Sequence, residues 1–356
     1  MQEGNLFLYF TNIQFDIFTK NSNIFPNISP LGIKGKILKK MKKLLFFLYI
    51  TACFSAQAQQ ENQYTQFMYN KLLVNPAFAG AREVTSVSAL YRQQWVGFEG
   101  APVSQLISFD SPILGKKLGL GLNLHHHTIG AVNDNYMVNM DYSYSLVKTK
   151  DVNVKLGIGG TFRYYKLDLT NPLLTTGSAG ADPAQLTPND YNYFNGNIGA
   201  GLYFTYKDFY VGLSVPNIYR NKLGKDNGNT LRAESSPHFY GMVGGLFPIT
   251  DNLDLKPALM VKYNANSPFS ADANISFVVK KKFTFGASYR VGQSAKGESI
   301  DALLFYQITE KFGIGAAYDY GVSELAKYNK GSYEMLLRYD FNATEKDIIT
   351  NPRFFF

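Results

Sequence analysis

Apolar and polar residues alternate with a period of two through most of the chain beyond residue 83, and this pattern predicts β-strands. Between residues 118 and 127, Leu118, Leu120, Leu122 and Leu124 are separated by small or polar residues. Successive side chains of a strand point to opposite faces, so each such segment has one apolar face and one small or polar face. Fourteen segments show the pattern, with approximate spans 84–94, 103–112, 118–127, 135–147, 152–167, 194–206, 208–216, 237–248, 253–264, 269–280, 283–292, 299–308, 312–322 and 332–341.

The connections between these segments alternate in length. Short connections lie near residues 115–117, 148–151, 207, 251–252, 281–282 and 310–311. The connections between them tend to be longer, notably 168–193 and 216–237. Strands of about ten residues joined in this way are typical of outer-membrane barrels. The sequence therefore predicts an all-β fold, a transmembrane antiparallel β-barrel of about 14 strands with short periplasmic turns and longer extracellular loops.

The segment 41–58 has the three regions of a secretory signal peptide. Two lysines follow Met41, the apolar run Leu44–Ile50 comes next, and Ala56-Gln57-Ala58 forms a small-x-small cleavage site. We expect cleavage after Ala58 and export of the chain. A buried helix is one alternative, and a lipoprotein signal that retains Cys53 is another.

Residues 1–40 precede this complete signal and show no clear periodicity, so we interpret them as a mis-annotated upstream extension. The remaining organisation is an N-terminal lead-in at 59–83, the barrel at 84–341 and a C-terminal tail at 342–356. Residues 1–58 hold seven lysines and two acidic residues, which is five of the eight net positive charges. The exported part is only mildly basic, which gives no support to nucleic-acid binding.

Composition excludes several other classes of protein. The longest apolar run has seven residues, against the ~20 that a membrane-spanning helix needs. Aromatic residues make up 15% of the chain and charged residues only 17%, which disfavours disorder. One cysteine cannot form a disulfide framework.

In the predicted barrel the apolar face meets lipid and the other face lines a polar lumen. The charged residues expected in the lumen are Asp141, Lys155, Arg163, Asp254, Lys256, Asp301, Glu334, Arg338 and Asp340. The alternative is a soluble β-sandwich, whose charged residues would face outward. The even strand count, the expected export and aromatic residues near strand ends favour the barrel. These aromatic residues are Tyr136, Tyr164, Phe209 and Tyr339.

A barrel of this width leaves space in its lumen, because side chains fill a barrel of about eight strands but not a much wider one. The candidates to occupy this space are the long loops and the N-terminal stretch Gln59 to Arg82. Within this stretch, Asn75-Pro76 signals a turn and Gly80 permits close backbone approach. The stretch has no strand alternation, and it reads as an ordered lead-in that packs in the barrel mouth.

Two stretches of the chain carry distinctive motifs. The first is Asn75-Pro76-Ala77-Phe78-Ala79-Gly80, and the second is the block from Arg92 to Pro102. Together with smaller matches elsewhere, they resemble the PorP/SprF family of type IX secretion system outer-membrane proteins. The residues that we assign to these two motifs are Asn75, Pro76, Ala77, Gly80, Arg92, Gln94, Trp95, Gly97, Phe98, Gly100 and Pro102. Further similarity lies in Leu118-Gly119-Leu120-Gly121, Ile129-Gly130 and Asn351-Pro352-Arg353-Phe354-Phe355. His125-His126-His127 departs from the pattern, which leaves the local chemistry there open.

The resemblance implies a non-enzymatic outer-membrane component of the type IX secretion system in a Bacteroidota-type bacterium. It implies a role in the secretion or surface attachment of large proteins, such as gliding adhesins, by docking their C-terminal domains. The expected partners are these domains, other secretion components, and outer-membrane lipid and lipopolysaccharide. Trp95 and Phe98, in a predicted outer loop, are the best candidates for docking, although both residues could simply pack the loop.

Two other functions are compatible with a barrel. A polar lumen also suits a diffusion channel or small-solute transporter. A purely structural barrel that tethers a periplasmic ring or a cell-wall-binding protein is a third possibility. The terminal Phe354-Phe355-Phe356 resembles the aromatic end that barrel-insertion machinery usually recognises.

Residue patterns for catalysis and for metal binding are missing. The chain has no Gly-x-Ser-x-Gly, P-loop or His-Glu-x-x-His motif, so we expect neither catalytic residues nor a cofactor. Neighbours on a strand face opposite ways, so at most His125 and His127 share a side, with His238 as the only other histidine. Structural zinc requires four converging ligands, so we expect no metal site.

Overall fold

The computed structural model describes residues 63–130, 133–167, 192–223, 233–234, 236–264, 267–292 and 297–341. All of them belong to one compact unit. The upstream extension, the signal peptide and the C-terminal tail predicted above lie outside the described residues.

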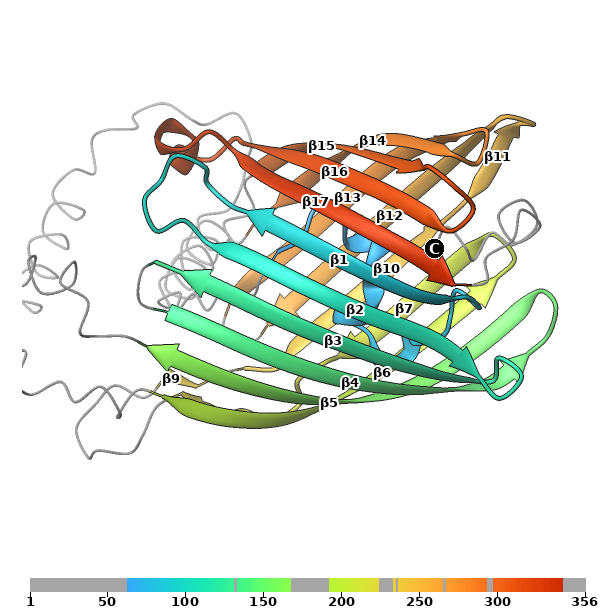
Figure 1. The fold of residues 1–356 in the computed structure, drawn as a ribbon, viewed down its shortest axis with the longest axis horizontal. Coiled ribbons are helices and arrows are strands. Elements are labelled where there is room, and N and C mark those ends of the chain that lie inside the picture. The colour runs from blue at the N-terminus through green and yellow to red at the C-terminus, as the bar shows by residue number, and fades with distance from the viewer. Residues whose placement is uncertain are drawn as a thin grey trace, which may run out of the picture. The chain divides into compact units, whose positions relative to one another are not determined.

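Fourteen antiparallel strands form a closed barrel, as the alternation predicts (Figure 1). These strands are β1 (Thr85–Gln93), β2 (Val103–Ile113), β3 (Leu118–Ile129), β4 (Asn133–Lys148), β5 (Val152–Leu167), β6 (Tyr193–Tyr206), β7 (Phe209–Val215), β10 (His238–Gly245), β12 (Leu253–Asn264), β13 (Ser267–Val279), β14 (Phe283–Val291), β15 (Gly297–Gln307), β16 (Phe312–Gly321) and β17 (Ser332–Phe341). β1 pairs with β17, and β10 pairs with both β7 and β12. The ring of strands is therefore complete, so none of these fourteen strands lies at a free edge of the sheet.

Three short strands lie outside this ring order. β11 (Phe247–Thr250) continues from β10 and pairs with the start of β12. β8 (Lys222–Leu223) and β9 (Ala233–Glu234) pair only with each other. The predicted spans agree with the observed strands to within a few residues, except that the segment predicted at 237–248 is divided between β10 and β11.

The two faces of each strand differ as predicted. In β17, buried and exposed residues alternate without interruption from Ser332 to Phe341. Glu334, Arg338 and Asp340 point inward and are almost completely buried, whereas Tyr333 and Tyr339 are exposed on the outside. The other charged residues predicted for the lumen are also buried, except Arg163, which is half-buried. The apolar faces therefore form the outer surface of the barrel, which is the reverse of a soluble sandwich.

The connections at the two ends of the barrel differ in length, although less regularly than the sequence suggests. β1 begins and β17 ends at the short-turn end, because Thr85 is the register partner of Phe341. The long connections lie at the other end, which we call the loop end (Figure 1). Two connections there, β3–β4 and β12–β13, span only three and two residues. A two- or three-residue hairpin is enough to reverse an antiparallel pair, so length alternation is not obligatory.

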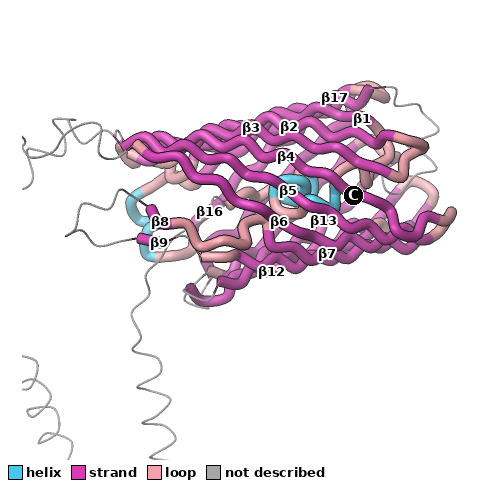
Figure 2. The backbone as a smooth tube through the Cα atoms, turned by 90° about the horizontal axis from the view of Figure 1, so that it is seen from below, coloured by secondary structure: helices cyan, strands magenta, loops and turns pink. Residues whose placement is uncertain are grey.

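Three of the described helices lie in the lumen, and all three are short 3₁₀ helices. They are η1 (Phe67–Tyr69), η2 (Lys71–Leu73) and η3 (Pro76–Phe78), and Figure 2 shows them enclosed by strands. A further 3₁₀ helix, η5 (Glu324–Tyr328), lies in the β16–β17 connection. No helix in the described part of the chain has the length and hydropathy needed to cross a membrane.

Candidate functional site

The N-terminal segment Gln63–Val84, which we call the plug, fills much of the lumen. Its apolar side chains form the barrel's interior core together with inward-facing residues of the wall, in two clusters around Phe78 and Tyr69. Phe78 packs edge-on against Tyr203 at 5.4 Å, and Tyr69 stacks on Phe305 at 4.6 Å between ring centroids. The structure therefore places the N-terminal stretch in the lumen, and most residues of the long loops, the other candidates, lie outside the described residues. This stretch is not confined to the barrel mouth but reaches deep into the lumen.

The motif Asn75–Gly80 contains η3 and attaches it to the barrel wall. The Asn75 side chain accepts a hydrogen bond from the Ala77 amide at 2.9 Å and donates one to the Leu202 carbonyl at 3.1 Å. Pro76 occupies the first position of η3, where its missing N–H is not needed. Asn75 therefore caps the helix and attaches it to β6 at the same time.

The wall beneath this motif is formed by Gly119, Gly157 and Gly201, which we call the glycine seat. A Cβ atom at Gly157 would lie 2.2 Å from the Ala77 nitrogen, and one at Gly119 would lie 1.9 Å from the Ala79 oxygen. One at Gly201 would lie 2.1 Å from the Asn75 side-chain oxygen. Real Cβ atoms do not approach other atoms so closely, so any other residue at these positions would displace the plug.

Three polar contacts hold the plug backbone along the same path. Ser143 donates a hydrogen bond to the Ala79 carbonyl at 2.7 Å, and Ser214 donates one to the Val74 carbonyl at 2.6 Å. The Gly80 amide donates to the carboxylate of Asp110. Backbone groups of an irregular buried segment need such partners, because an unpaired buried amide or carbonyl is costly.

Arg92 connects the plug to the seam between the first and last strands. Its guanidinium lies 2.6 Å from Asp319 and 3.2 Å from Glu334, and it also donates to the Thr65 hydroxyl at 3.1 Å. The Glu334 carboxylate accepts hydrogen bonds from the amides of Thr65 at 2.9 Å and Gln66 at 2.8 Å. We call Arg92, Asp319 and Glu334 the seam clamp. It holds the start of the plug against β1, β16 and β17.

A second charged group holds the end of the plug. Arg82 pairs with Asp340 through both guanidinium nitrogens, at 2.8 and 3.3 Å, and both side chains are buried. The plug is therefore fixed near its start by hydrogen bonds to the seam clamp, near its end by the Arg82–Asp340 ion pair, and between them by the glycine seat. Removing one partner of any of these buried pairs should destabilise the fold strongly, because it leaves a buried charge uncompensated.

Lys71 lies at the centre of the plug. It is almost fully buried, its ammonium group donates to the Met68 carbonyl at 2.9 Å, and it lies 4.5 Å from the centroid of the Tyr210 ring. Burial, together with the nearby cations Lys256, Arg82 and Arg338, lowers the pKa of Lys71 well below its usual range. Burial and the neighbouring cations thus disfavour the charged form of Lys71 in the middle of the lumen.

The second motif forms the β1–β2 connection at the loop end, residues 94–102, which we call the brace loop. The Val96 amide donates to the Gly331 carbonyl at 2.8 Å, and the Lys330 amide donates to the Val96 carbonyl at 2.7 Å. On its other side, the Gly130 amide donates to the Gly100 carbonyl at 2.8 Å. The loop is therefore hydrogen-bonded to the connections on both of its sides and is held in one conformation.

The two predicted docking residues differ in exposure. Phe98 is 55% exposed at the tip of the brace loop. Trp95 is half-buried, its backbone adopts a positive φ of 45°, and its amide donates to the Ser332 hydroxyl at 3.3 Å. Phe98 therefore offers an accessible aromatic surface, whereas Trp95 contributes mainly to the shape of the loop.

The structure divides the predicted motif residues into two groups. Asn75, Pro76, Ala77 and Gly80 lie in the plug, and Arg92 reaches it from β1. The others lie in the brace loop and at its junction with β2, and they are Gln94, Trp95, Gly97, Phe98, Gly100 and Pro102. The sequence placed Glu334 in the lumen but did not indicate its pairing with Arg92, and it gave no indication of Asp319 as a partner or of the role of the glycine seat. Glycines at inward-facing strand positions were the available signal for the seat.

The three consecutive histidines alternate in direction, as a strand requires. His125 and His127 are buried in the lumen, where His125 lies 2.7 Å from the Tyr64 hydroxyl and His127 lies 2.8 Å from the Ser104 hydroxyl. His126 faces outward and stacks on Tyr136 at 4.4 Å. Within the described ranges, no group of three or more His, Cys, Asp or Glu side chains is arranged to hold a metal ion.

Comparison with known proteins gives one strong match. The family model described as "Type IX secretion system membrane protein PorP/SprF" matches residues 56–339, which include the plug, the seam clamp and the brace loop. No curated protein matches the chain significantly.

Solved structures of outer-membrane proteins share the barrel architecture at low identity. The Acinetobacter baumannii outer membrane protein Omp33 is 9% identical, with a TM-score of 0.42, over 72% of this chain and 99% of that chain. The Ralstonia pickettii toluene transporter TbuX is 11% identical, with a TM-score of 0.44, over 78% and 93%. A Pseudomonas aeruginosa FadL homologue is 12% identical, with a TM-score of 0.43, over 81% and 96%. These similarities are between barrels, and they do not bear on what this chain binds.

Proposed function

Because the chain belongs to the PorP/SprF family of type IX secretion system membrane proteins, we propose that it supports the secretion or surface attachment of large proteins by docking their C-terminal domains. Its family makes it an outer-membrane component of this system and suggests association with other components. Cargo such as gliding adhesins, in a Bacteroidota-type bacterium, belongs to the proposal.

The observation that carries the proposal is the brace loop. It is hydrogen-bonded to the connections on both sides, and it exposes Phe98. A rigid loop loses little conformational entropy when it binds a partner, and an exposed aromatic side chain is a common anchor of protein interfaces. The loop end therefore suits recognition of a folded domain.

The plug supports a docking function over free diffusion. It is attached to the wall by the seam clamp, by the glycine seat and by the Arg82–Asp340 pair. A path for solutes through the space that the plug occupies would require the plug to move against all three. A diffusion channel or small-solute transporter is the competing function, and it predicts a steady open conductance.

The purified barrel should bind a purified C-terminal domain from a secreted surface protein of the same bacterium. The Phe98→Ala variant should weaken this binding about tenfold, because loss of an interface anchor typically costs more than 1 kcal/mol. Phe247→Ala is a matched control, since Phe247 is an exposed phenylalanine near the opposite, short-turn end. Equal binding by Phe98→Ala and wild type would contradict docking through this loop.

Single-channel recording on the same preparation separates the two functions. The proposed docking function predicts a closed barrel that binds the domain. A steady open conductance without domain binding would favour the diffusion channel instead.

Export of the chain by the segment 41–58, with translation beginning at Met41 and cleavage after Ala58, belongs to the same proposal. The family match begins at residue 56, close to the expected cleavage site. N-terminal sequencing of the mature protein should begin at Gln59. Sequencing of the precursor should find no peptide from before Met41, and detection of one would contradict the expected start.

A further inference from the structure

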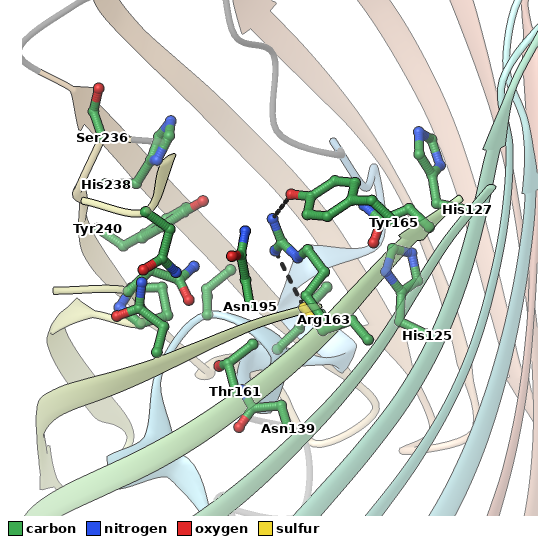
Figure 3. Close-up of a pocket in the computed structure, with 18 of the residues that line it drawn as sticks. His125, His127, Asn139, Thr161, Arg163, Tyr165, Asn195, Ser236, His238 and Tyr240 are labelled. Atoms are coloured by element: carbon green, nitrogen blue, oxygen red, sulfur yellow. Dashed lines mark hydrogen bonds between the residues drawn. The ribbon is translucent and has the colours of Figure 1, made fainter. Parts of the chain in front are cut away.

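A cavity of about 300 Å³, which we call the vestibule, lies in the lumen on the loop-end side of the plug (Figure 3). Its wall comes mainly from β3, β4, β5, β6 and β10, and the plug contributes Tyr64, Leu73 and Val74. This volume is at the lower limit of typical small-molecule sites. The vestibule is separate from the brace loop, and the function proposed above does not use it.

Strand register arranges the side chains of the vestibule in rungs across β4, β5 and β6. In an antiparallel sheet, directly opposed residues place their side chains side by side on one face. The three rungs are Asn139–Thr161–Asn197, Met137–Arg163–Asn195 and Asn135–Tyr165–Tyr193. Figure 3 shows Asn139 and Thr161 close together, with Arg163 and Tyr165 above them. Each rung therefore presents at least one carboxamide, and the third rung adds two tyrosine rings.

The vestibule is rich in amides and poor in charge. Seven asparagines line it among the described residues, and they are Asn133, Asn135, Asn139, Asn195, Asn197, Asn217 and Asn221. The described lining includes no carboxylate, and Arg163 is its one lysine or arginine. The guanidinium of Arg163 is held against the wall, since it donates to the Tyr165 hydroxyl at 2.8 Å and contacts the Met137 sulfur at 3.2 Å. Such a site disfavours cationic ligands and suits uncharged polar ones.

Two of these amides have an oxygen with no partner in the described structure. They are the side-chain oxygens of Asn135 and Asn139, and Asn139 is only 4% exposed. A buried amide oxygen without a hydrogen bond is unfavourable, so a ligand that supplies O–H donors there would gain from satisfying it. Aromatic rings are close at hand, because Tyr165 stacks on Tyr193 at 4.6 Å and Tyr240 lies on the opposite side of the cavity.

We infer that the vestibule binds an uncharged saccharide of one or two rings. Sugar hydroxyls both donate and accept hydrogen bonds, as do the carboxamides of the asparagine rungs. The C–H faces of a pyranose ring pack well on tyrosine rings, which present a large apolar surface beside a polar group. The saccharide comes either free from the medium or as the sugar part of a lipid headgroup, and the experiment separates these two sources.

The test is calorimetric titration of the purified mature protein in detergent. The probes are a panel of uncharged mono- and disaccharides and a neutral lipid that carries a headgroup of one or two sugars. Saturable binding of at least one probe is expected. Binding of the free sugars indicates a source in the medium, and binding of only the glycolipid indicates the headgroup.

Two variants test the location of the site. The double variant Asn139→Leu, Thr161→Val removes the polar groups of one rung while keeping side-chain volume similar, and it should weaken binding at least tenfold, by about 1.4 kcal/mol. Asn195→Ala, a milder change at a half-buried position of the next rung, should weaken it less. Asn252→Leu is the control, because Asn252 is exposed in a short turn at the other end of the barrel.

Heat-modifiable migration in electrophoresis shows that each variant is folded before titration. Absence of saturable binding by every probe would overturn the inference. So would unchanged affinity in both the double variant and Asn195→Ala.

Discussion

Arg92 and Glu334 are register partners across the seam where β1 meets β17, and their charged groups lie 3.2 Å apart inside the lumen. The same glutamate accepts hydrogen bonds from the backbone of Thr65 and Gln66. One carboxylate therefore joins the first strand, the last strand and the plug, although its partners lie 242 to 269 positions before it in the sequence.

Glu334→Ala should destabilise the folded barrel by about 3–5 kcal/mol, because it leaves a buried guanidinium with one fewer counter-charge. It also leaves two plug amides without an acceptor. Urea unfolding in lipid vesicles, followed by fluorescence of the single tryptophan, measures the change. Glu310→Ala is the control, since Glu310 is exposed in a short turn. Equal unfolding midpoints for the two variants would contradict the role of the seam clamp.

Gly157→Ala should displace the plug, because the new Cβ would lie 2.2 Å from the Ala77 backbone nitrogen. The displaced plug should raise single-channel conductance and increase protease sensitivity near residue 77. Gly160→Ala is a matched control on the same strand, where a Cβ would meet no atom within 4 Å. If Gly157→Ala stays as closed and as protease-resistant as Gly160→Ala, the glycine seat does not hold the plug.

Asn75→Ala should loosen the plug without unfolding the barrel. It removes the cap of η3 and the bond to the Leu202 carbonyl, which together contribute about 1–2 kcal/mol. Hydrogen exchange at the amides of Ala77 and Phe78 should accelerate by about tenfold or more. Exchange on distant strands such as β14 should stay unchanged, and uniform acceleration throughout the barrel would indicate global destabilisation instead.

Lys71 should make stability depend on pH in the alkaline range. Its pKa is lowered in the folded protein, so between that pKa and the ordinary value of 10.5 the unfolded chain binds a proton that the folded chain lacks. The free energy of unfolding contributed by this group should therefore rise as pH rises through that window.

The Lys71→Met variant keeps most of the side-chain volume and removes the titrating group. The unfolding free energy of the variant minus that of the wild type should decrease as pH increases towards 10.5, because Lys71 raises only the wild-type value. A difference that does not change with pH would show that Lys71 titrates alike in the folded and unfolded states.

Much of the barrel wall could be predicted from local pattern. The segments predicted at 152–167, 253–264 and 332–341 match β5, β12 and β17 at both ends. The inward direction of Asp141, Glu334 and Arg338 was predictable as well, because the period-two alternation assigns every second side chain to one face. The break between β10 and β11 was not, because it depends on pairing with both β7 and β12.

The candidate site was only partly predictable. Its motifs identified Asn75, Gly80 and Arg92 as important, but they did not indicate what these residues contact. The mouth-level lead-in expected from the sequence is instead a plug anchored deep in the lumen, since many of its contacts join residues far apart in the chain. The docking role of Trp95 and Phe98 is still a prediction.

The sequence by itself determined the strands, their two faces and their approximate number, because these follow from interactions between near neighbours along the chain. Only the tertiary structure decided how the ring closes, which glycines face the plug and which carboxylates meet Arg92. These features depend on the register of closure and on the path of the plug. Both are settled by packing and charge pairing between segments that approach one another only when the whole barrel has formed.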